Sequence, residues 1–581
     1  METAWKEISL QTSPLAGKKI LLLCKDLDVQ ETFISLLEEQ ENEVFAFDVD
    51  VTLHEQIDFI ICADALCDNN KFIVDTDILI RLQIALKQIE SQKNQASCIA
   101  LTSGLFNHYA GFNADAALLN GVFKSLTNEN TQHNFKVVDI PVLYTEEDLK
   151  NCLQLITAEN KFKLISLDNN KTYIQQLIQP DSTSADTALN IDFNKTIMVI
   201  GGTSGLGLKT AEWLSEKGAT YLVLVSRSGE KEETKPVIHR ILQNKTQLAV
   251  FKGDMSDKKE LLKCKTTIEN DMPPIGTVIH AAAVLQDRLF FDSSRDEMET
   301  VLQAKVKIAQ HLHDVFSSPE VQLIFYSSLA DIVGTMAQAV YSGSNYYLDN
   351  LTHYRKQKGL PTKTVNWGNI AEIGLAAKEE NRGKQLEEQG LGLINIQDIE
   401  AYLQLLFSSD KPQLITAKIN FEQWKKNYPM VLQDVYFENF IQENIVQITS
   451  EERTAFNQPN LDLAQKWIKS RIKDFVAEIT KIPSTKLKDD DTFKSIGIDS
   501  LMALQLKNKI QSAFQLSLNV SSVWSYPTAD KFTRFLSDEL KLTQHYNTDA
   551  SSKETSKTKD IEQEIKELSL EELMRQLNEK L

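Results

Sequence analysis

A glycine-rich turn between an apolar strand and an amphipathic helix is the feature that most constrains the fold of this chain. The turn lies in TIMVIGGTSGLGLKTAEWLSEKGA, residues 196–219, and contains Gly201, Gly202, Gly205 and Gly207. Such glycines let the backbone approach a pyrophosphate, while the helix N-terminus offers N–H groups and partial positive charge. The flanking strand and helix are the context that this site requires. The sequence therefore predicts a dinucleotide-binding unit, and a purely structural turn is the alternative.

The following strands extend the predicted nucleotide site. YLVLVSRSG ends in Ser226 and Arg227, where an acidic residue would bind the ribose of NAD. Arginine there suits the 2′-phosphate of NADP, although a solvated surface arginine fits the same pattern. Asp254 stands at a strand end where an adenine contact is expected, and Ala281–Ala283 would let a nicotinamide ribose lie close. The predicted cofactor-binding residues are Gly201, Gly202, Thr203, Ser204, Gly205, Leu206, Gly207, Ser226, Arg227, Asp254, Met255, Ala281, Ala282 and Ala283.

Residues 17–180 also alternate between strand-like and helix-like stretches, which predicts a parallel sheet flanked by helices. The first strand, KKILLLC, runs into CKDLDVQE, which has no glycine. A phosphate could not approach the backbone closely there. We therefore expect a structural α/β subdomain that lacks the nucleotide loop.

A serine and a tyrosine follow the glycine turn, in LIFYSSLADIVGTMAQAVYSGSNYYLDNL. Tyr341 lies thirteen residues after Ser328. A tyrosine near a nicotinamide can act as general acid on a carbonyl that is being reduced, if a nearby cation lowers its pKa. A serine hydroxyl can hold the carbonyl oxygen. Either residue alone is more often a core or surface residue, so their occurrence together predicts the reducing site.

The C-terminal part of the chain changes character. Residues 461–540 show amphipathic helical patterns and little strand signal, which predicts a small all-helical module. Ser500, in IGIDSLMALQL, stands at a helix start, where N–H groups favour a phosphate. A polar stretch, TQHYNTDASSKETSKTKD, is predicted to be a flexible tether.

Composition argues against several classes of function. A net charge of −19 over 581 residues argues against a general binder of nucleic acid or anionic membranes. The six cysteines form no CxxC pair and no histidines cluster, so no metal site is predicted. There is no N-terminal apolar segment and no apolar run of membrane length. We expect a cytoplasmic protein with reduced cysteines.

Residues 190–430 resemble the catalytic half of a modular polyketide synthase ketoreductase, in the short-chain dehydrogenase/reductase superfamily. Residues 1–185 are similar to the degenerate structural subdomain of the same family. The resemblance implies reduction of a β-ketoacyl thioester by NADPH. The matching stretches are GGTSGLG, VLVSRSG, HAAAVLQDRLF, VLQAKVKIAQHLH, YSSLADIVG, AVYSGSNYYLDNL and NWGN.

This resemblance assigns the catalytic roles. It makes Tyr341 the proton donor and Ser328 the residue that orients the ketone. Most short-chain reductases have a lysine four residues after the tyrosine, where this chain has Asn345. Ketoreductases of synthases take the lysine from an upstream helix, which matches Lys305. Lys305 is expected to lower the tyrosine pKa, and Asn345 to position the proton relay. Ile200 replaces the family's usual threonine before the glycines, which we expect to be tolerated.

Residues 461–543 resemble an acyl carrier protein, through GIDSL, DDDTFKSIGIDSLMALQLKNKI and VWSYPTADKF. In that family a phosphopantetheinyl transferase attaches 4′-phosphopantetheine to the serine, here Ser500. Asp499 is expected to help hold the metal during that encounter. Gln505 replaces the usual glutamate, which we expect to weaken one partner contact without affecting modification. The arm would carry the β-ketoacyl group that Tyr341 helps to reduce.

The resemblance also implies a stereochemical outcome. Ketoreductases that give a D-configured hydroxyl usually carry LDD after the HAAG-like strand, and this chain has LQD, ending at Asp287. The opposite class has a tryptophan eight residues before the tyrosine, where Val333 stands here. We therefore expect a D-configured product, 3R in simple chains, with Gln286 as the departure from the pattern.

The last residues, KDIEQEIKELSLEELMRQLNEKL, predict a short helix from Leu570, because Ser569 and Glu572 form a capping box. Its apolar stripe resembles the docking segments that end synthase polypeptides, and a frayed acidic tail is the alternative. The implied partners are the ketosynthases of the same and the next module, and the N-terminal docking element of the downstream synthase polypeptide.

The predicted fold class is α/β, with two Rossmann-like subdomains, the first degenerate and the second NADP-binding. A small four-helix carrier domain and a short helical tail follow. Two alternatives stay open: a carrier and docking segment with an inactive ketoreductase fold, and a stand-alone short-chain dehydrogenase with an accessory helical domain. The predicted segments are 1–185 structural subdomain, 186–440 catalytic subdomain, 441–460 linker, 461–543 carrier, 544–560 flexible linker and 561–581 docking helix.

Overall fold

A computed structural model of the chain contains two compact units, residues 1–443 and 444–581, and each is described by itself. The predicted C-terminal helix lies outside the described residues. The structure describes residues 1–543 except for 51, 67–71, 93, 107–110, 131, 180–187, 372, 374–382, 384, 385, 388, 429–433, 442–454, 456, 457, 515, 517, 519 and 520.

The first sheet has eight strands in the order β1-β8-β7-β6-β5-β4-β2-β3, parallel except at β1 and β8. Strands β2 and β4 are nearly continuous apolar runs, because helices cover both faces of the sheet. The strands are β1 (Glu2–Ile8), β2 (Lys19–Leu23), β3 (Glu43–Ala46), β4 (Phe59–Cys62), β5 (Ser97–Ser103), β6 (Asn134–Ile140), β7 (Leu164–Asp168) and β8 (Lys171–Ile178). The helices are α1 (Leu27–Glu38), α2 (Thr76–Ser91), α3 (Ala114–Glu129) and α4 (Glu146–Leu155).

The turn after β2 confirms that this first subdomain lacks a nucleotide loop. The side chain of Asp26 caps α1 and accepts hydrogen bonds from the backbone N–H groups of Asp28 and Val29, each at 3.1 Å. These are the groups that would otherwise face a phosphate. A carboxylate of the chain itself therefore takes the place of an anionic ligand.

The second sheet has seven parallel strands in the order β11-β10-β9-β12-β13-β14-β16. The order reverses next to β9, so a crevice opens at the carboxyl ends of β9 and β12. The strands are β9 (Thr196–Ile200), β10 (Tyr221–Ser226), β11 (Gln247–Lys252), β12 (Ile275–His280), β13 (Gln322–Ser328), β14 (Thr362–Trp367) and β16 (Gln413–Thr416). The helices include α5 (Gly205–Glu216), α6 (Lys235–Gln243), α7 (Lys258–Asp271), α8 (Arg295–Leu302), α9 (Ile308–Val315), α10 (Ala330–Val333), α11 (Ala339–Gln357), α13 (Ile396–Ser408) and α14 (Phe421–Asn427).

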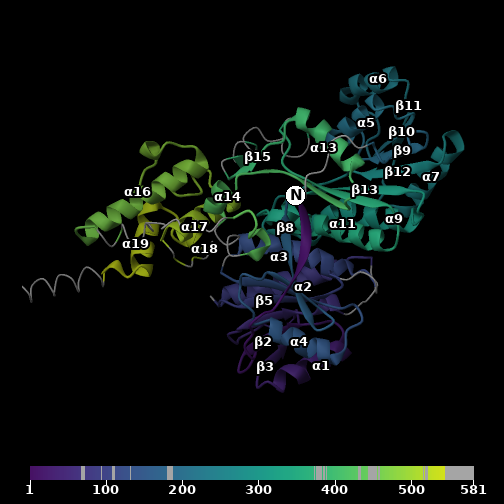
Figure 1. Cartoon of the computed structure of the whole chain (residues 1–581). Coiled ribbons are helices and arrows are strands. Elements are labelled where there is room, and N and C mark those ends of the chain that lie inside the picture. The colour runs from purple at the N-terminus through teal and green to yellow at the C-terminus, as the bar shows by residue number, and fades with distance from the viewer. Residues whose placement is uncertain are drawn as a thin grey trace, which may run out of the picture. The chain divides into compact units, whose positions relative to one another are not determined.

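Helices α3 and α11 join the two subdomains (Figure 1). A Cβ atom on Gly121 would lie 2.5 Å from the carbonyl oxygen of Ser342, and one on Gly343 would lie 2.7 Å from that of Leu118. The helix backbones therefore approach closely at these two glycines, where even a Cβ atom would not fit. Strand β1 adds a second connection, because the N-terminal amine donates to the carbonyl of Ile415 at 3.1 Å.

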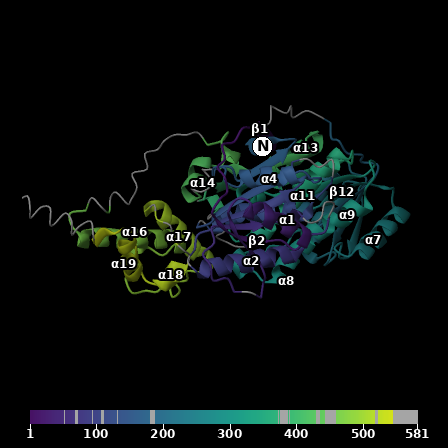
Figure 2. The same cartoon turned by 90° about the horizontal axis from the view of Figure 1, so that it is seen from below.

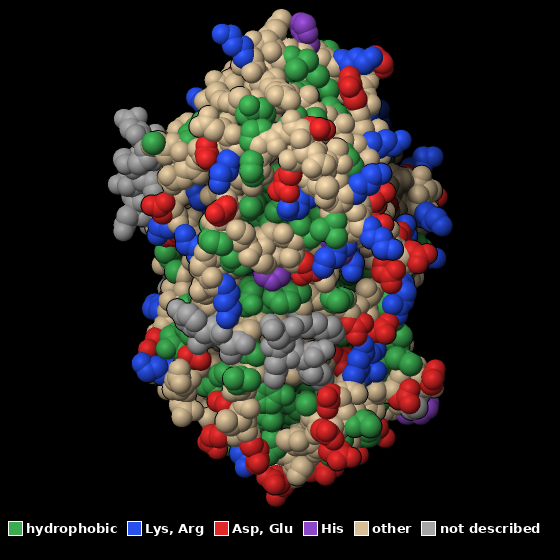
Figure 3. Space-filling view, turned by 90° about the vertical axis from the view of Figure 1, so that its right-hand side faces the viewer, with side chains coloured by type: hydrophobic (Ala, Val, Ile, Leu, Met, Phe, Trp, Pro, Cys, Tyr) green, Lys and Arg blue, Asp and Glu red, His purple; other side chains and the backbone are tan. Residues whose placement is uncertain are grey.

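Helix α2 of the first subdomain also lies beside α8 of the second (Figure 2), where Arg295 forms an ion pair with Asp77. On the face shown in Figure 3, Lys and Arg side chains are interspersed with Asp and Glu, so that face presents no continuous basic patch among its described residues. None of the described helices has the length and apolar character that a membrane crossing requires.

The described residues of the second unit form four α-helices: α16 (Leu461–Thr480), α17 (Ser500–Phe514), α18 (Ser521–Ser525) and α19 (Ala529–Glu539). Their apolar faces meet in one core, which includes the fully buried side chains of Ile468, Leu506 and Phe532. The predicted small helical module is therefore confirmed.

The close contact of α3 with α11 predicts that Gly121→Ala is destabilising. Alanine would favour the helix by about 1 kcal/mol, but its Cβ would force two backbones apart, and overpacking costs about 1–3 kcal/mol. The nearest atoms to this Cβ all belong to the backbone and cannot rotate away, so the overpacking cost should lie in the upper part of that range. We therefore expect a net loss of about 1–2 kcal/mol in the free energy of unfolding of the 1–443 unit, measured by urea titration of the full chain. The exposed Lys87→Ala is the control, and stability equal to the wild type in Gly121→Ala would contradict the packing argument.

Candidate active site and carrier serine

The glycine turn opens the N-terminus of α5. Strand β9 ends at Ile200, Gly201 adopts a left-handed φ of +81°, and α5 begins at Gly205. Ser204 stands at the helix N-cap, but its side chain makes no capping hydrogen bond. The first N–H groups of α5 therefore face the turn without the carboxylate that caps α1, which fits a pyrophosphate.

At three of the glycines a side chain would also collide with neighbouring backbone. A Cβ on Gly201 would lie 2.8 Å from the backbone nitrogen of Ala282, and one on Gly207 would lie 2.4 Å from the carbonyl oxygen of Gly201. A Cβ on Gly202 would lie 2.7 Å from the carbonyl oxygen of Val199. Gly207 therefore lets the helix approach the turn, as the dinucleotide fold requires.

A cleft of about 1000 Å³ runs from this turn to the ends of β12 and β13. All the predicted cofactor residues line it except Gly202 and Gly207, which pack behind the turn. Ile200, the departure from the family pattern, also lines the cleft. Trp367, in the NWGN stretch, and Lys231 line it as well, although neither was assigned a role from the sequence. No local motif marks Lys231, because the fold brings it to the cleft.

The side chains that follow β10 and β11 differ in how many hydrogen bonds hold them. Ser226 Oγ accepts hydrogen bonds from Thr203 Oγ1 at 2.7 Å and from the Gly229 N–H at 3.0 Å, so it fixes the local turn. Arg227 is exposed and lines the cleft, and it takes part in no ion pair within the described part of the chain. Asp254 Oδ1 accepts from the N–H and hydroxyl of Ser256, at 2.9 and 2.7 Å.

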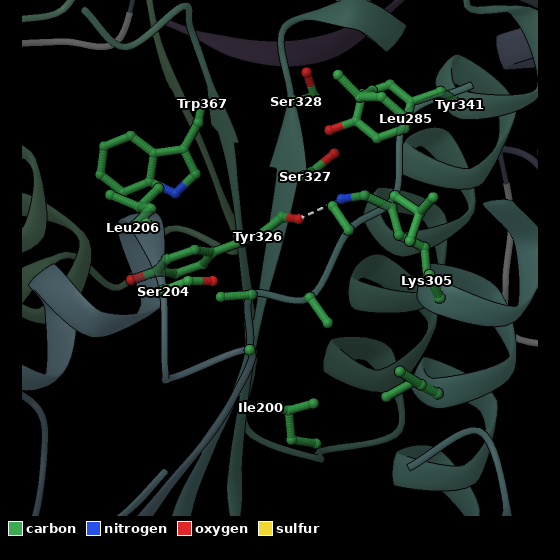
Figure 4. Close-up of a pocket in the computed structure, with 18 of the residues that line it drawn as sticks. Ile200, Ser204, Leu206, Leu285, Lys305, Tyr326, Ser327, Ser328, Tyr341 and Trp367 are labelled. Carbon is green, nitrogen blue, oxygen red and sulfur yellow. Dashed lines mark hydrogen bonds between the residues drawn. The ribbon is translucent and has the colours of Figure 1, made fainter. Parts of the chain in front are cut away.

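The predicted catalytic residues meet at the far end of the cleft (Figure 4). Ser328 ends β13, Tyr341 lies in the first turn of α11, and Lys305 lies on a π-helical turn, Gln303–Lys307, between α8 and α9. Such turns occur frequently at functional sites. In Figure 4 the hydroxyl of Tyr341 lies near that of Ser328, and Lys305 reaches the same region from another helix.

Lys305 is buried and held by a backbone carbonyl. Its ammonium donates to the carbonyl oxygen of Tyr326 at 2.8 Å and lies 5.2 Å from the centroid of the Tyr341 ring. Burial lowers the pKa of Lys305 to about 7, although Asp331 and Asp349 act to raise it. A lysine of this kind can gain or lose a proton near neutral pH.

Burial raises the pKa of Tyr341 to about 12, and a hydrogen bond with Ser328 acts in the opposite direction. The tyrosine is therefore protonated at neutral pH and available as an acid. The lowering of its pKa by Lys305 stays a prediction.

Asn345 lies one turn after Tyr341 on α11 and is fully buried. Its Nδ2 donates to the carbonyl of Tyr341 at 2.7 Å. Its Oδ1 is buried and has no hydrogen-bond partner among the described residues. A buried acceptor of this kind favours a water molecule, which fits the predicted proton relay.

Ser500 begins α17, as the sequence predicted. The preceding Asp499 caps this helix, because its Oδ1 accepts from the N–H of Met502 at 2.8 Å. Gly497 adopts a left-handed φ of +88° in the approach to the helix. The side chain of Ser500 lies outside the described ones. Within the described residues, no group of three or more acidic, histidine or cysteine side chains could hold a metal.

Comparison with known families matches residues 195–372 to the KR domain and residues 470–536 to the phosphopantetheine attachment site. The chain contains a KR domain followed by a phosphopantetheine attachment domain, and polyketide synthases are among its homologues.

Two curated relatives set this region in a larger context. A phenolphthiocerol/phthiocerol polyketide synthase protein of Mycobacterium tuberculosis is 26% identical over 368 residues, which are 62% of this chain and 16% of that protein. A 6-methylsalicylic acid synthase of Arthrobotrys oligospora is 22% identical over 475 residues, which are 78% of this chain and 27% of that protein. The chain thus spans no more than 27% of the length of these two relatives.

Solved ketoreductases share the fold of the first unit. An A1-type ketoreductase superposes with a TM-score of 0.64 at 18% identity, covering 74% of this chain and 98% of that one. PlmKR1, from the first module of phoslactomycin biosynthesis in Streptomyces sp. HK803, gives 0.63 at 19% identity, covering 76% and 98%. These similarities confirm the predicted pair of α/β subdomains.

The ketoreductase residue Asp287 lies in an exposed loop beside the cleft and accepts a hydrogen bond from Gln338 Nε2 at 2.8 Å. Gln338 itself lines the cleft, as does Val333. Sequence reasoning missed Gln338, although its position three residues before Tyr341 could have indicated a role.

The ketoreductase turn yields a direct prediction for Gly207→Ala. The added Cβ would push α5 away from Gly201 and remove the helix N–H groups from the phosphate site. We expect the affinity for NADPH to fall by about tenfold or more, measured by fluorescence titration. Glu216→Ala, at the exposed end of the same helix, should bind like the wild type, and an unchanged affinity in Gly207→Ala would contradict the assignment.

Proposed function

We propose that this chain reduces a β-ketoacyl thioester to a D-configured β-hydroxyacyl thioester, with NADPH as the reductant and the substrate held on 4′-phosphopantetheine at Ser500. The observation that carries this proposal is the cleft, which joins an open helix N-terminus at one end to Ser328, Lys305 and Tyr341 at the other. We also propose that the reaction takes place in the cytoplasm and that the chain is part of a larger synthase.

Each of these residues has a separate role in the proposed reaction. NADPH, when bound, supplies the hydride. The hydroxyls of Ser328 and Tyr341 lie near each other, so both can donate hydrogen bonds to the ketone oxygen and stabilise the negative charge that develops there. Tyr341 then gives its proton to that oxygen. The Lys305 ammonium stabilises the resulting tyrosinate, and a water on Asn345 Oδ1 can return the proton.

Tyr341→Phe should therefore slow reduction by roughly 10²–10⁴, with unchanged affinity for NADPH. The matched control is Tyr347→Phe, because Tyr347 lies on the same helix, is fully buried and donates to the carbonyl of Phe72 at 3.0 Å. That control should retain most of the rate. Steady-state NADPH oxidation measures both, and a wild-type rate in Tyr341→Phe would show that another group is the acid.

Arg227 supports the choice of NADPH over NADH, because it is an exposed cation at the end of β10. Arg227→Ala should weaken NADPH by about 10–100-fold, the range expected for a lost charge-assisted contact. The affinity for NADH should change little. Lys263→Ala, which removes a charge from the exposed side of α7, serves as control. Equal losses for both nucleotides would reject the phosphate role.

The carrier role rests on the attachment-site family match and on the start of α17 at Ser500. A phosphopantetheinyl transferase would modify Ser500, with Asp499 helping to hold the magnesium ion. The D-configuration rests on Asp287 and on the absence of a tryptophan at Val333. Chiral chromatography that shows mainly the 3S alcohol from an unbranched substrate would overturn it.

We assign residues 561–581 to docking, on the sequence alone. The tail would deliver the loaded carrier to the docking element of the next polypeptide and to its ketosynthase, with the two contacts reinforcing each other. Deleting residues 561–581 should leave reduction intact and lower chain transfer to that partner. A chain with these residues scrambled is the control for length and charge, and unchanged transfer after deletion would refute the assignment.

A further inference from the structure

The two loops that border the catalytic end of the cleft are held by side chains of the first subdomain. We name them the 285–293 loop, which carries Asp287, and the 333–338 loop, which leads into α11. Residues of both loops, among them Leu285, Val333 and Gln338, line the cleft. A substrate bound at Tyr341 would therefore lie beside both loops.

One buried carboxyl group contacts both loops. Glu129, the last residue of α3, is buried, and its two oxygens accept separate backbone hydrogen bonds. Oε2 accepts from the N–H of Phe290 at 2.8 Å, and Oε1 accepts from the N–H of Ala337 at 3.0 Å. Burial raises the pKa of Glu129 to about 8, and the bonds from the two N–H groups act in the opposite direction. Near pH 7 the group is therefore mostly a neutral carboxyl, whose oxygens still accept these two bonds.

The bond to Ala337 holds a strained residue. Ala337 adopts a left-handed φ of +61°, a conformation that alanine keeps only when its surroundings enforce it. Its carbonyl accepts from the N–H of Arg288 at 2.8 Å, which ties it to the other loop. The next residue, Gln338, holds Asp287. Glu129 therefore stands at the start of a chain of contacts that sets the spacing of the loops.

Two other side chains of the first subdomain also hold these loops. Asn128 donates to the carbonyls of Val333 and Gly334, at 3.1 and 2.6 Å. Gln83, on α2, donates to the carbonyls of Phe290 and Ser293, at 2.5 and 2.9 Å. Among these side chains, Glu129 alone contacts both loops.

We propose that Glu129 is a positioning residue for specificity, which holds the 285–293 and 333–338 loops at the spacing that selects the face of the ketone for reduction. This inference rests on the proposed ketoreduction and extends it. It gives the degenerate subdomain a function in stereocontrol in addition to its structural support of α11.

The test uses Glu129→Gln in the full-length chain. Glutamine has the same size, but its amide would place a donor against one of the two N–H groups. With a 3-oxopentanoyl pantetheine thioester and NADPH, the ratio of the two hydroxyl configurations should fall by about tenfold, and kcat should fall with it. The dissociation constant for NADPH should not change. A product ratio equal to that of the wild type would overturn the proposal.

Asp139→Asn is the matched control. Asp139 is equally a buried carboxyl group of the first subdomain, and it accepts from the N–H groups of Leu105 and Phe106 at 3.0–3.1 Å, but it contacts neither loop. The Asp139→Asn chain should be less stable than the wild type but keep the wild-type product ratio. A similar loss of selectivity in Asp139→Asn would show that general destabilisation is the cause, and would also overturn the proposal.

A second variant covers a failure of Glu129→Gln to fold. Gln83→Met keeps the size of the side chain and removes the donor to the 285–293 loop, so the ratio should fall by a smaller factor, and an unchanged ratio counts against the proposal. If the wild type reduces no thioester, the proposed function fails. Amide hydrogen exchange still tests the contacts: Phe290 and Ala337 should exchange faster in Glu129→Gln, and equal rates would refute the role of Glu129.

Discussion

The contact of α3 with α11 is the interaction on which the rest of the ketoreductase unit depends. Helix α11 carries Tyr341 and Asn345, and its outer face needs a partner that can approach as closely as Gly121 allows. The hydroxyls of Ser125 and Ser342 add a buried hydrogen bond of 2.8 Å across the same interface. The first subdomain, whose own nucleotide position is blocked by Asp26, thus serves as the support against which the catalytic helix is placed.

This placement brings Lys305 and Tyr341 into a buried setting that changes their proton affinities. Burial lowers the pKa of Lys305 and raises that of Tyr341, so a neutral tyrosine lies beside a lysine that can exchange its proton near pH 7. Hydrogen bonds in such a setting are strong because little water competes for them. The π-helical turn is what brings Lys305 there from a helix other than that of the tyrosine.

Local patterns were enough to predict the parts of the site that local structure determines. The turn from Gly201 to Gly207 is contiguous, and Ser328 and Tyr341 flank one short loop, so the sequence indicated them directly. The position of Lys305 needed the family resemblance, because nothing in its own helix marks it. Glu129 could not be predicted: its bond to Ala337 spans 208 residues, and only the packing of α3 on α11 brings the two together.

The proposed function requires that the ketoreductase acts on an acyl group attached to the carrier serine of the same chain. The most direct test loads 3-oxobutyryl phosphopantetheine onto Ser500, adds NADPH and follows the acyl-carrier peptide by mass spectrometry. We expect the acyl group of the wild type to gain the mass of two hydrogen atoms, while the Tyr341→Phe chain keeps the keto mass. A wild-type acyl group that keeps the keto mass in the presence of NADPH would contradict the proposed reduction.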